Sequence, residues 1–441
     1  MSDDAVLIVS ADCHAGPPVD RYREWVDPAW RDEYDRFVVA HREWRTTQNR
    51  SMGLPDDGEL IDSLFGEDMI EFFKGNEALG LEGSTGVWDS DRRTGDLEAE
   101  GIAAEVIFPD FQNRNEPPWG AAFPFPDTDA RRRREGARAY NRWLADFCDL
   151  LPGRRAGLAI VQPHDVEAAV ADVTWAAGRG LAGIMLPTGD TTLASYHDSR
   201  YDPLWAACVD AGLSVTFHSG GTPWEGYGWH AMWSTKLEFL WWSHRPLWQC
   251  IFGGVFERFP ALEMVFTEQG ADWIPDTLGR LDEQYFSPFE RAVGQLLSKS
   301  PTEYWHSNCY VGASFMSRGE AEIRDQLGVS RIMWGADYPH IEGTWPRSRD
   351  ALRDTMNGCR EDELRQMVGL TAARVYGFDV AALRAVADRI GPHPADLLSE
   401  PAPPPVHYDP VDYATGRVST KESARRIAGL MAGPSRGPVM S

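Results

Sequence analysis

The chain has 441 residues, 43% of them hydrophobic, which is enough for a large folded core. It carries 43 Lys and Arg against 67 Asp and Glu, a formal net charge of −24 that excludes nucleic acid and anionic membrane surfaces as favoured partners. No run of about 18 apolar residues predicts a membrane span. The N-terminus has no signal-peptide pattern, and the six cysteines form no CxxC pair. We therefore expect a cytoplasmic protein with reduced thiols.

Short apolar runs alternate with helical patterns along most of the chain. Several of the runs are almost continuously apolar, which is typical of strands that are buried on both faces. Alternation of strands and helices indicates a parallel sheet, and eight repeats favour a closed (β/α)8 barrel of the TIM type over an open sheet. The predicted strands are residues 6–11, 104–108, 157–161, 183–186, 213–217, 264–267, 310–312 and 332–335.

Two segments depart from this alternation. Residues 20–100, between the first two strands, are acidic and rich in Trp, Gly and Asp. They predict an insertion that either covers the mouth of the barrel or forms a peripheral subdomain. Residues 381–398 predict a helix, and the four prolines within residues 400–405 end it. The predicted organisation is a barrel domain over residues 1–380 and a C-terminal helix with a proline-rich tail over residues 381–441.

Polar side chains that can bind a metal stand at the ends of several predicted strands, where the chemistry of an α/β barrel is located. Asp12 and His14 are two residues apart, so they point to the same face of the first strand. Buried carboxylates are costly without a cation, and no Lys or Arg lies in these motifs. The pattern predicts one or two divalent ions of Zn, Mn or Fe. The candidate ligands are Asp12, His14, Glu105, His218, Glu268 and Asp337.

Five motifs resemble those of the amidohydrolase-related family that includes aminocarboxymuconate-semialdehyde decarboxylase and the resorcylate-type decarboxylases. They are SADCHAGPP at 10–18, FHSGG at 217–221, IFGGVFERFP at 251–260, TEQGADWIP at 267–275 and WGADYPHIEGTWP at 334–346. The resemblance covers residues 5 to about 380. It implies a distorted, metal-bearing (β/α)8 barrel that can pair into a homodimer. The positions that resemble the family's metal ligands are Asp12, His14, His218 and Asp337.

The sequence departs from the family pattern at three positions. Asp12 stands where the family usually has His or Glu, and Glu268 stands where the decarboxylases have an acid–base His. The fourth strand ends without a Lys, so a carboxylated Lys bridging two metals is not expected. The missing His argues against decarboxylation, and the carboxylate-rich ligand set favours Mn or Fe more than a thiolate-rich set would.

Hydrolysis of a small organic carbonyl or carboxylate substrate is the leading functional hypothesis. A metal ion would lower the pKa of a bound water, and Asp337 or Glu268 would accept its proton. His340, His244 or His230 would hold the substrate oxygen or protonate the leaving group.

Three alternatives remain open from the sequence. In the first, one or two non-heme irons activate dioxygen to hydroxylate an organic substrate, for example one linked to CoA, with Glu105 as an additional ligand. The second is decarboxylation. The third is a catalytically inactive barrel that serves binding or assembly.

The loop after the fifth predicted strand contains candidates for substrate binding. Aromatic rings in this loop could line a pocket for an apolar substrate, and packing of the same rings as a lid explains them equally well. The candidates are Trp224, Trp229 and His230. Asn308, before the seventh strand, is a candidate for a hydrogen bond to the substrate or for a structural cap. The expected partner is a small organic molecule.

Overall fold

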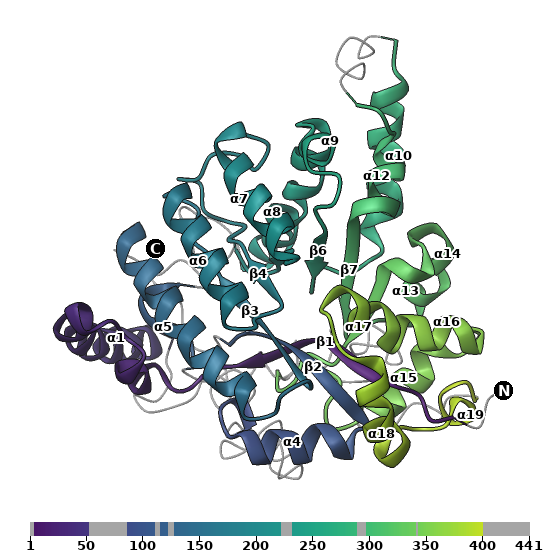
Figure 1. The fold of residues 1–441 in the computed structure, drawn as a ribbon, viewed down its shortest axis with the longest axis horizontal. Helices are drawn as coiled ribbons and strands as arrows, with labels where there is room; N and C mark the ends of the chain where they lie inside the picture. Colours follow the sequence, from purple (N-terminus) through teal and green to yellow (C-terminus); the bar gives the residue numbers. More distant parts are fainter. Residues whose placement is uncertain are drawn as a thin grey trace, which may run out of the picture.

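The computed structural model describes residues 4–52, 86–110, 115–121, 128–221, 232–288, 297–340 and 343–399. Eight parallel strands follow one another around a single sheet in chain order, with helices outside them (Figure 1). This confirms the predicted (β/α)8 fold. The strands are β1 Ile8–Ala15, β2 Ile102–Pro109, β3 Arg155–Ile160, β4 Gly183–Met185, β5 Ser214–His218, β6 Met264–Thr267, β7 Cys309–Ser314 and β8 Ile332–Gly335.

Backbone hydrogen bonds join the chain after β8 to β1. The N–H of Asp337 donates to the carbonyl of Asp12 over 2.9 Å, and the N–H of His14 donates to the carbonyl of Tyr338 over 2.6 Å. The sheet therefore closes into a barrel. Every residue of the eight strands is buried, which explains why most strands read as continuous apolar runs in the sequence.

Helices cover the outside of the barrel, and side-chain caps fix where several of them begin. The side chains of Asp129 and Asp165 accept from the backbones of Arg132 and Ala168. The helices are α1 Arg31–Met52, α4 Ser90–Ala99, α5 Ala130–Asp149, α6 Val166–Gly178, α7 Asp202–Ala211, α8 Met232–Phe252, α9 Val255–Arg258, α10 Trp273–Phe286, α12 Pro301–Asn308, α13 Arg318–Glu322, α14 Arg324–Leu327, α15 Ser348–Met356, α16 Glu361–Arg365, α17 Thr371–Val375, α18 Val380–Ile390 and α19 Pro394–Leu397.

The described parts of the predicted insertion pack against the side of the barrel. Helix α1 lies near α5, where Glu33 pairs with Arg132 at 2.5 Å, and α4 packs on β2 (Figure 1). Residues 53–85 lie outside the described residues, so the covering of the mouth stays a prediction.

The predicted C-terminal helix is two helices, α18 and α19, because Gly391 and Pro392 interrupt it. The proline-rich tail lies outside the described residues. Within the described ranges, no helix is long and apolar enough to cross a bilayer.

Candidate metal centre

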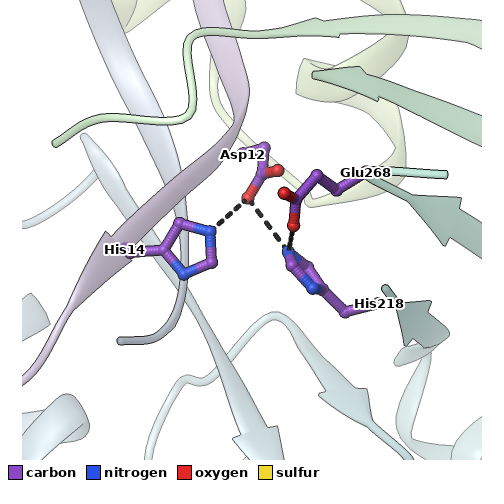
Figure 2. A group of neighbouring side chains, drawn as sticks. All are labelled: Asp12, His14, His218 and Glu268. Atoms are coloured by element: carbon purple, nitrogen blue, oxygen red, sulfur yellow. Dashed lines mark ion pairs between the residues drawn. The ribbon is translucent and has the colours of Figure 1, made fainter. Parts of the chain in front are cut away.

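Four side chains from three strand ends converge at one point inside the barrel (Figure 2). Asp12 and His14 come from β1, His218 ends β5, and Glu268 directly follows β6. One potential ligand atom of each lies within 4.8 Å of the others. Asp12 Oδ1 lies 3.4 Å from His14 Nε2 and 3.6 Å from His218 Nε2, which in turn lies 3.2 Å from Glu268 Oε2.

Both imidazoles are oriented by hydrogen bonds to backbone carbonyls. His14 Nδ1 lies 2.9 Å from the carbonyl of Pro109, and His218 Nδ1 lies 3.0 Å from that of Ser219. A carbonyl only accepts, so each Nδ1 carries a hydrogen and each Nε2 faces the centre. This is the arrangement in which His binds a metal, with a second partner fixing the ring.

The carboxylates are oriented by neighbouring hydroxyl groups. The hydroxyl of Ser314, the last residue of β7, donates to Asp12 Oδ2. The hydroxyl of Ser219 donates to Glu268 Oε2 over 2.9 Å. Each hydrogen bond holds one oxygen of its carboxylate and so fixes the orientation of that carboxylate relative to the centre.

A second group of potential ligands shares His14 with the first. Asp337 Oδ1 lies 3.1 Å from both His14 Nε2 and His340 Nδ1. The rings of His14 and His340 stack, with 3.8 Å between their centroids and 19° between their planes. His340 Nε2 lies 2.9 Å from Asp110 Oδ1. Asp110 was not among the predicted site residues, although it directly follows β2 and so carried the same strand-end signal as the others.

Backbone conformation also marks the strand ends that carry the site. Glu268 and Asp337 have φ values of 55° and 56°, in the left-handed region that side chains other than Gly rarely adopt. Such conformations concentrate at functional sites, where the surrounding structure holds them. Gly335 is required beside them, since a Cβ there would lie 2.7 Å from the Cβ of Asp12.

The buried atoms at the centre fit a divalent cation. Among the described residues, Asp12 Oδ1, His14 Nε2, His218 Nε2 and both carboxylate oxygens of Asp337 are buried without a hydrogen-bond partner. Unpaired buried donors and acceptors are costly. Imidazole nitrogens and carboxylate oxygens are, however, the ligands that Zn, Mn and Fe accept.

The electrostatics of the centre call for positive charge. Burial works against protonation of His218, but the charges of Glu268 and Asp12 outweigh it and raise the pKa of His218 to about 9. Burial likewise opposes ionisation of Asp337, yet His340 and His14 hold its pKa well below the usual range. The cluster therefore favours a bound cation, whether a proton or a metal ion.

The structure corrects the prediction that Glu105 is a metal ligand. Its carboxylate lies 2.6 Å from Arg93 Nη2 and 3.3 Å from Arg155 Nε. Burial opposes its charge, but Arg93 overcomes that effect and lowers the pKa of Glu105. Because guanidinium groups already neutralise it, Glu105 needs no metal.

Of the two roles predicted for Asn308, the hydrogen bond to substrate is not supported, because Asn308 precedes β7 and so lies at the end of the barrel opposite Ser314. Its amide donates to the carbonyls of Pro260 and Leu262 over 3.0 and 2.9 Å, a structural role. His244, on α8, lies outside both ligand groups and stacks on Trp273 with 3.7 Å between ring centroids. Burial lowers the pKa of His244 to about 4, so it is neutral at pH 7. The predicted substrate-binding residues Trp224, Trp229 and His230 lie outside the described residues.

Comparison with known proteins agrees with the motifs. The sequence model of the amidohydrolase family matches residues 118–378, more than half of the chain. The chain belongs to the amidohydrolase family. This amidohydrolase is 23% identical over 250 residues to 2-amino-3-carboxymuconate-6-semialdehyde decarboxylase of Dictyostelium discoideum, a match that covers 55% of this chain and 67% of the relative. The resemblance indicated by the motifs is confirmed.

Solved structures share the barrel. An amidohydrolase from Mycobacterium avium subsp. paratuberculosis K-10 has a TM-score of 0.62 at 18% identity, over 86% of this chain and 100% of the other. The 5-carboxyvanillate decarboxylase of Novosphingobium aromaticivorans, solved with manganese and 4-hydroxy-3-methoxy-5-nitrobenzoic acid, has a TM-score of 0.60 at 18% identity, over 86% and 99%. At these identities the likeness establishes the fold.

Proposed function

We propose that this amidohydrolase is a metal-dependent hydrolase of small organic carbonyl or carboxylate compounds. The supporting observation is the set of buried nitrogen and oxygen atoms that face one another without hydrogen-bond partners among the described residues. The residues that would hold the ion are Asp12 and His218 from the first ligand group, Asp337 from the second, and His14, which belongs to both. When bound, a divalent ion lowers the pKa of a coordinated water and polarises a carbonyl oxygen.

Glu268 is the residue best placed to move a proton. Its side chain is 16% exposed, whereas Asp12 and Asp337 are fully buried, and one of its oxygens already accepts from Ser219. We infer that Glu268 takes the proton of the attacking water and delivers it to the leaving group.

A second proton route is available on the other side of His14. His340 lies between two carboxylates, with Nδ1 facing Asp337 and Nε2 facing Asp110. In this proposal Asp110 fixes the orientation of the His340 ring. His340 holds a proton beside Asp337 and can donate it to an oxygen of the substrate.

Decarboxylation is the second candidate, because one relative in sequence and one solved structure with this barrel are decarboxylases. The two reactions need different groups at position 268. A decarboxylase must deliver a proton to the carbon that loses CO₂, whereas hydrolysis uses a base that accepts a proton from water. The carboxylate of Glu268 suits the second task.

One experiment separates the two reactions. Purified protein loaded with Mn²⁺ is assayed under argon against carboxylated phenols, and in parallel against aryl esters, lactones and carboxamides. Hydrolysis predicts turnover of the second set and no release of CO₂ from the first. Release of CO₂ without hydrolysis would establish the decarboxylase instead. Protein as purified is assayed in air as a third arm; activity seen only there, in protein that carries two irons per chain, would make the enzyme an oxygenase.

A further inference from the structure

Helix α4 carries a fully buried arginine, Arg93, directly behind the metal centre. Its Nε lies 2.8 and 2.9 Å from the two oxygens of Glu105, and its Nη2 lies 2.6 Å from one of them. Its Nη1 donates to the carbonyl of His14 over 2.8 Å and to that of Gly86 over 3.1 Å. All three guanidinium nitrogens therefore have partners, and one partner is the backbone of a candidate metal ligand.

The same helix contacts the second strand end that carries a ligand. The guanidinium carbon of Arg93 lies 5.0 Å from the ring centroid of Tyr338, the residue after Asp337. The hydroxyl of Tyr338 donates over 2.8 Å to Asp96, also on α4. The carbonyl of Tyr338 accepts from the N–H of His14. Arg93 thus contacts both His14 and Tyr338, the two residues joined by a hydrogen bond that helps to close the barrel at the metal centre.

The charges explain why an arginine is stable at this position. Glu105 pairs with Arg93 and lies 3.3 Å from Arg155, so two guanidinium groups share one carboxylate. A buried charge of this kind is tolerated only when it is paired and hydrogen-bonded. A Lys would keep the charge, but its single ammonium cannot reproduce the planar fork that reaches Glu105 and His14 together.

We propose that Arg93 is a positioning residue for the metal centre, holding the backbone of β1 and the Tyr338 segment so that His14 and Asp337 point to a common ion. This inference rests on one part of the proposed function, the binding of a divalent ion at this centre, and does not require hydrolysis. Partners behind metal ligands commonly change metal affinity by about 10–100-fold when they are removed. Arg93 acts one step further back, through the backbone, so an effect of about tenfold is expected.

The test measures affinity for Mn²⁺ alone, followed by the electron paramagnetic resonance signal of the free ion. The variants are Arg93→Lys, Arg93→Met and the double variant Arg93→Met/Glu105→Gln, which avoids leaving a buried carboxylate with one partner fewer. The matched control is Arg389→Met, which removes an exposed arginine that pairs with Glu98 on the outer side of the same helix at 2.6 Å. Each protein is also melted with and without Mn²⁺, since a bound ligand raises Tm according to its affinity.

We expect the dissociation constant for Mn²⁺ to rise about tenfold in Arg93→Lys and in the double variant, with a smaller rise of Tm on adding the ion. The control should match the wild type. An unchanged dissociation constant, with Tm lowered equally in metal-free and metal-loaded protein, would show a purely structural role and overturn the proposal. Wild-type protein that binds no Mn²⁺ would overturn both proposals. Binding without hydrolysis would overturn the proposed reaction alone.

Discussion

Buried carboxylates lie on the two sides of β1, and they are neutralised differently. On one side Glu105 faces Cys13 and is paired with guanidinium groups. On the other side Asp12 meets imidazoles and other carboxylates and keeps an oxygen without a hydrogen-bond partner among the described residues. Burial alone therefore does not identify a ligand. What distinguishes a structural carboxylate from a candidate ligand is whether the protein itself supplies the counter-charge.

Removing a side chain on the imidazole side should have the largest effect. His14 belongs to both ligand groups, so His14→Ala should release the ion. Asp337 belongs to the second group, and Asp337→Asn removes its charge, so this variant should release the ion to a similar degree. We expect turnover to fall by more than about 100-fold, because even partners behind metal ligands cost up to about that factor. Circular dichroism should show an intact barrel. Near-normal turnover in either variant, with the metal retained, would show that the site is wrongly assigned.

Glu268→Gln tests the role of a carboxylate that is both a candidate ligand and a candidate base. The amide has the same shape and can still accept from Ser219, but it cannot take a proton from water. We expect kcat to fall by about 10²–10⁴-fold, the usual contribution of a general base, with most of the metal retained. Metal content by mass spectrometry and steady-state rates measure the two effects separately. A loss of metal in proportion to the loss of rate would assign Glu268 to binding alone.

Gly335→Ala perturbs the site through its backbone. The added methyl group would lie 2.7 Å from the Cβ of Asp12 and 3.1 Å from its backbone nitrogen, so β1 must shift. We expect a loss of about 1–3 kcal/mol in the free energy of unfolding, as for other overpacked sites, together with weaker Mn²⁺ binding. Urea unfolding of metal-free protein isolates the first effect. Gly279→Ala on α10 is the control, because nothing lies within 4 Å of its added Cβ and Ala favours a helix.

The sequence alone predicts the barrel and most of the convergence of the site. Strand ends of a parallel barrel meet at one mouth, so Asp12, His218 and Asp337 could be placed together without coordinates. The first strand runs to Ala15, beyond the predicted end at residue 11, because its last polar residues are buried by the site itself. In a strand buried on both faces, hydrophobic periodicity does not reveal which way Glu105 points.

The partners of the polar residues were less predictable than their positions. Arg93 stands in a helix within the predicted insertion, and nothing in its local pattern distinguishes it from the exposed Arg92 beside it. Asp110 and His340 are 230 positions apart and meet only through the closed barrel. Such contacts depend on the register of the strands and on helix packing, which local sequence patterns do not specify.

Glu100 is a third kind of buried carboxylate, and its substitution is expected to have the smallest effect of those predicted. It belongs to neither group of potential metal ligands, and it is not paired with buried guanidinium groups as Glu105 is. Instead it accepts from the backbone N–H of Ser348 at the start of α15 over 2.5 Å. Burial, only partly offset by this hydrogen bond, raises its pKa to about 7. Between the ordinary pKa of a Glu, about 4.3, and pH 7, the folded protein keeps a proton that the unfolded chain has lost.

The contribution of Glu100 to stability is therefore fully present below about pH 4.3 and is lost as the pH rises through 7. Glu100→Gln keeps an oxygen that can accept from Ser348 but cannot ionise. We expect this variant to gain about 1–2 kcal/mol relative to wild type between pH 5 and pH 8, measured by urea unfolding. The same pH dependence in both proteins would show that Glu100 is ionised in the fold. In that case the carboxylate of Glu100 would need a counter-charge of its own, as Arg93 supplies one to Glu105.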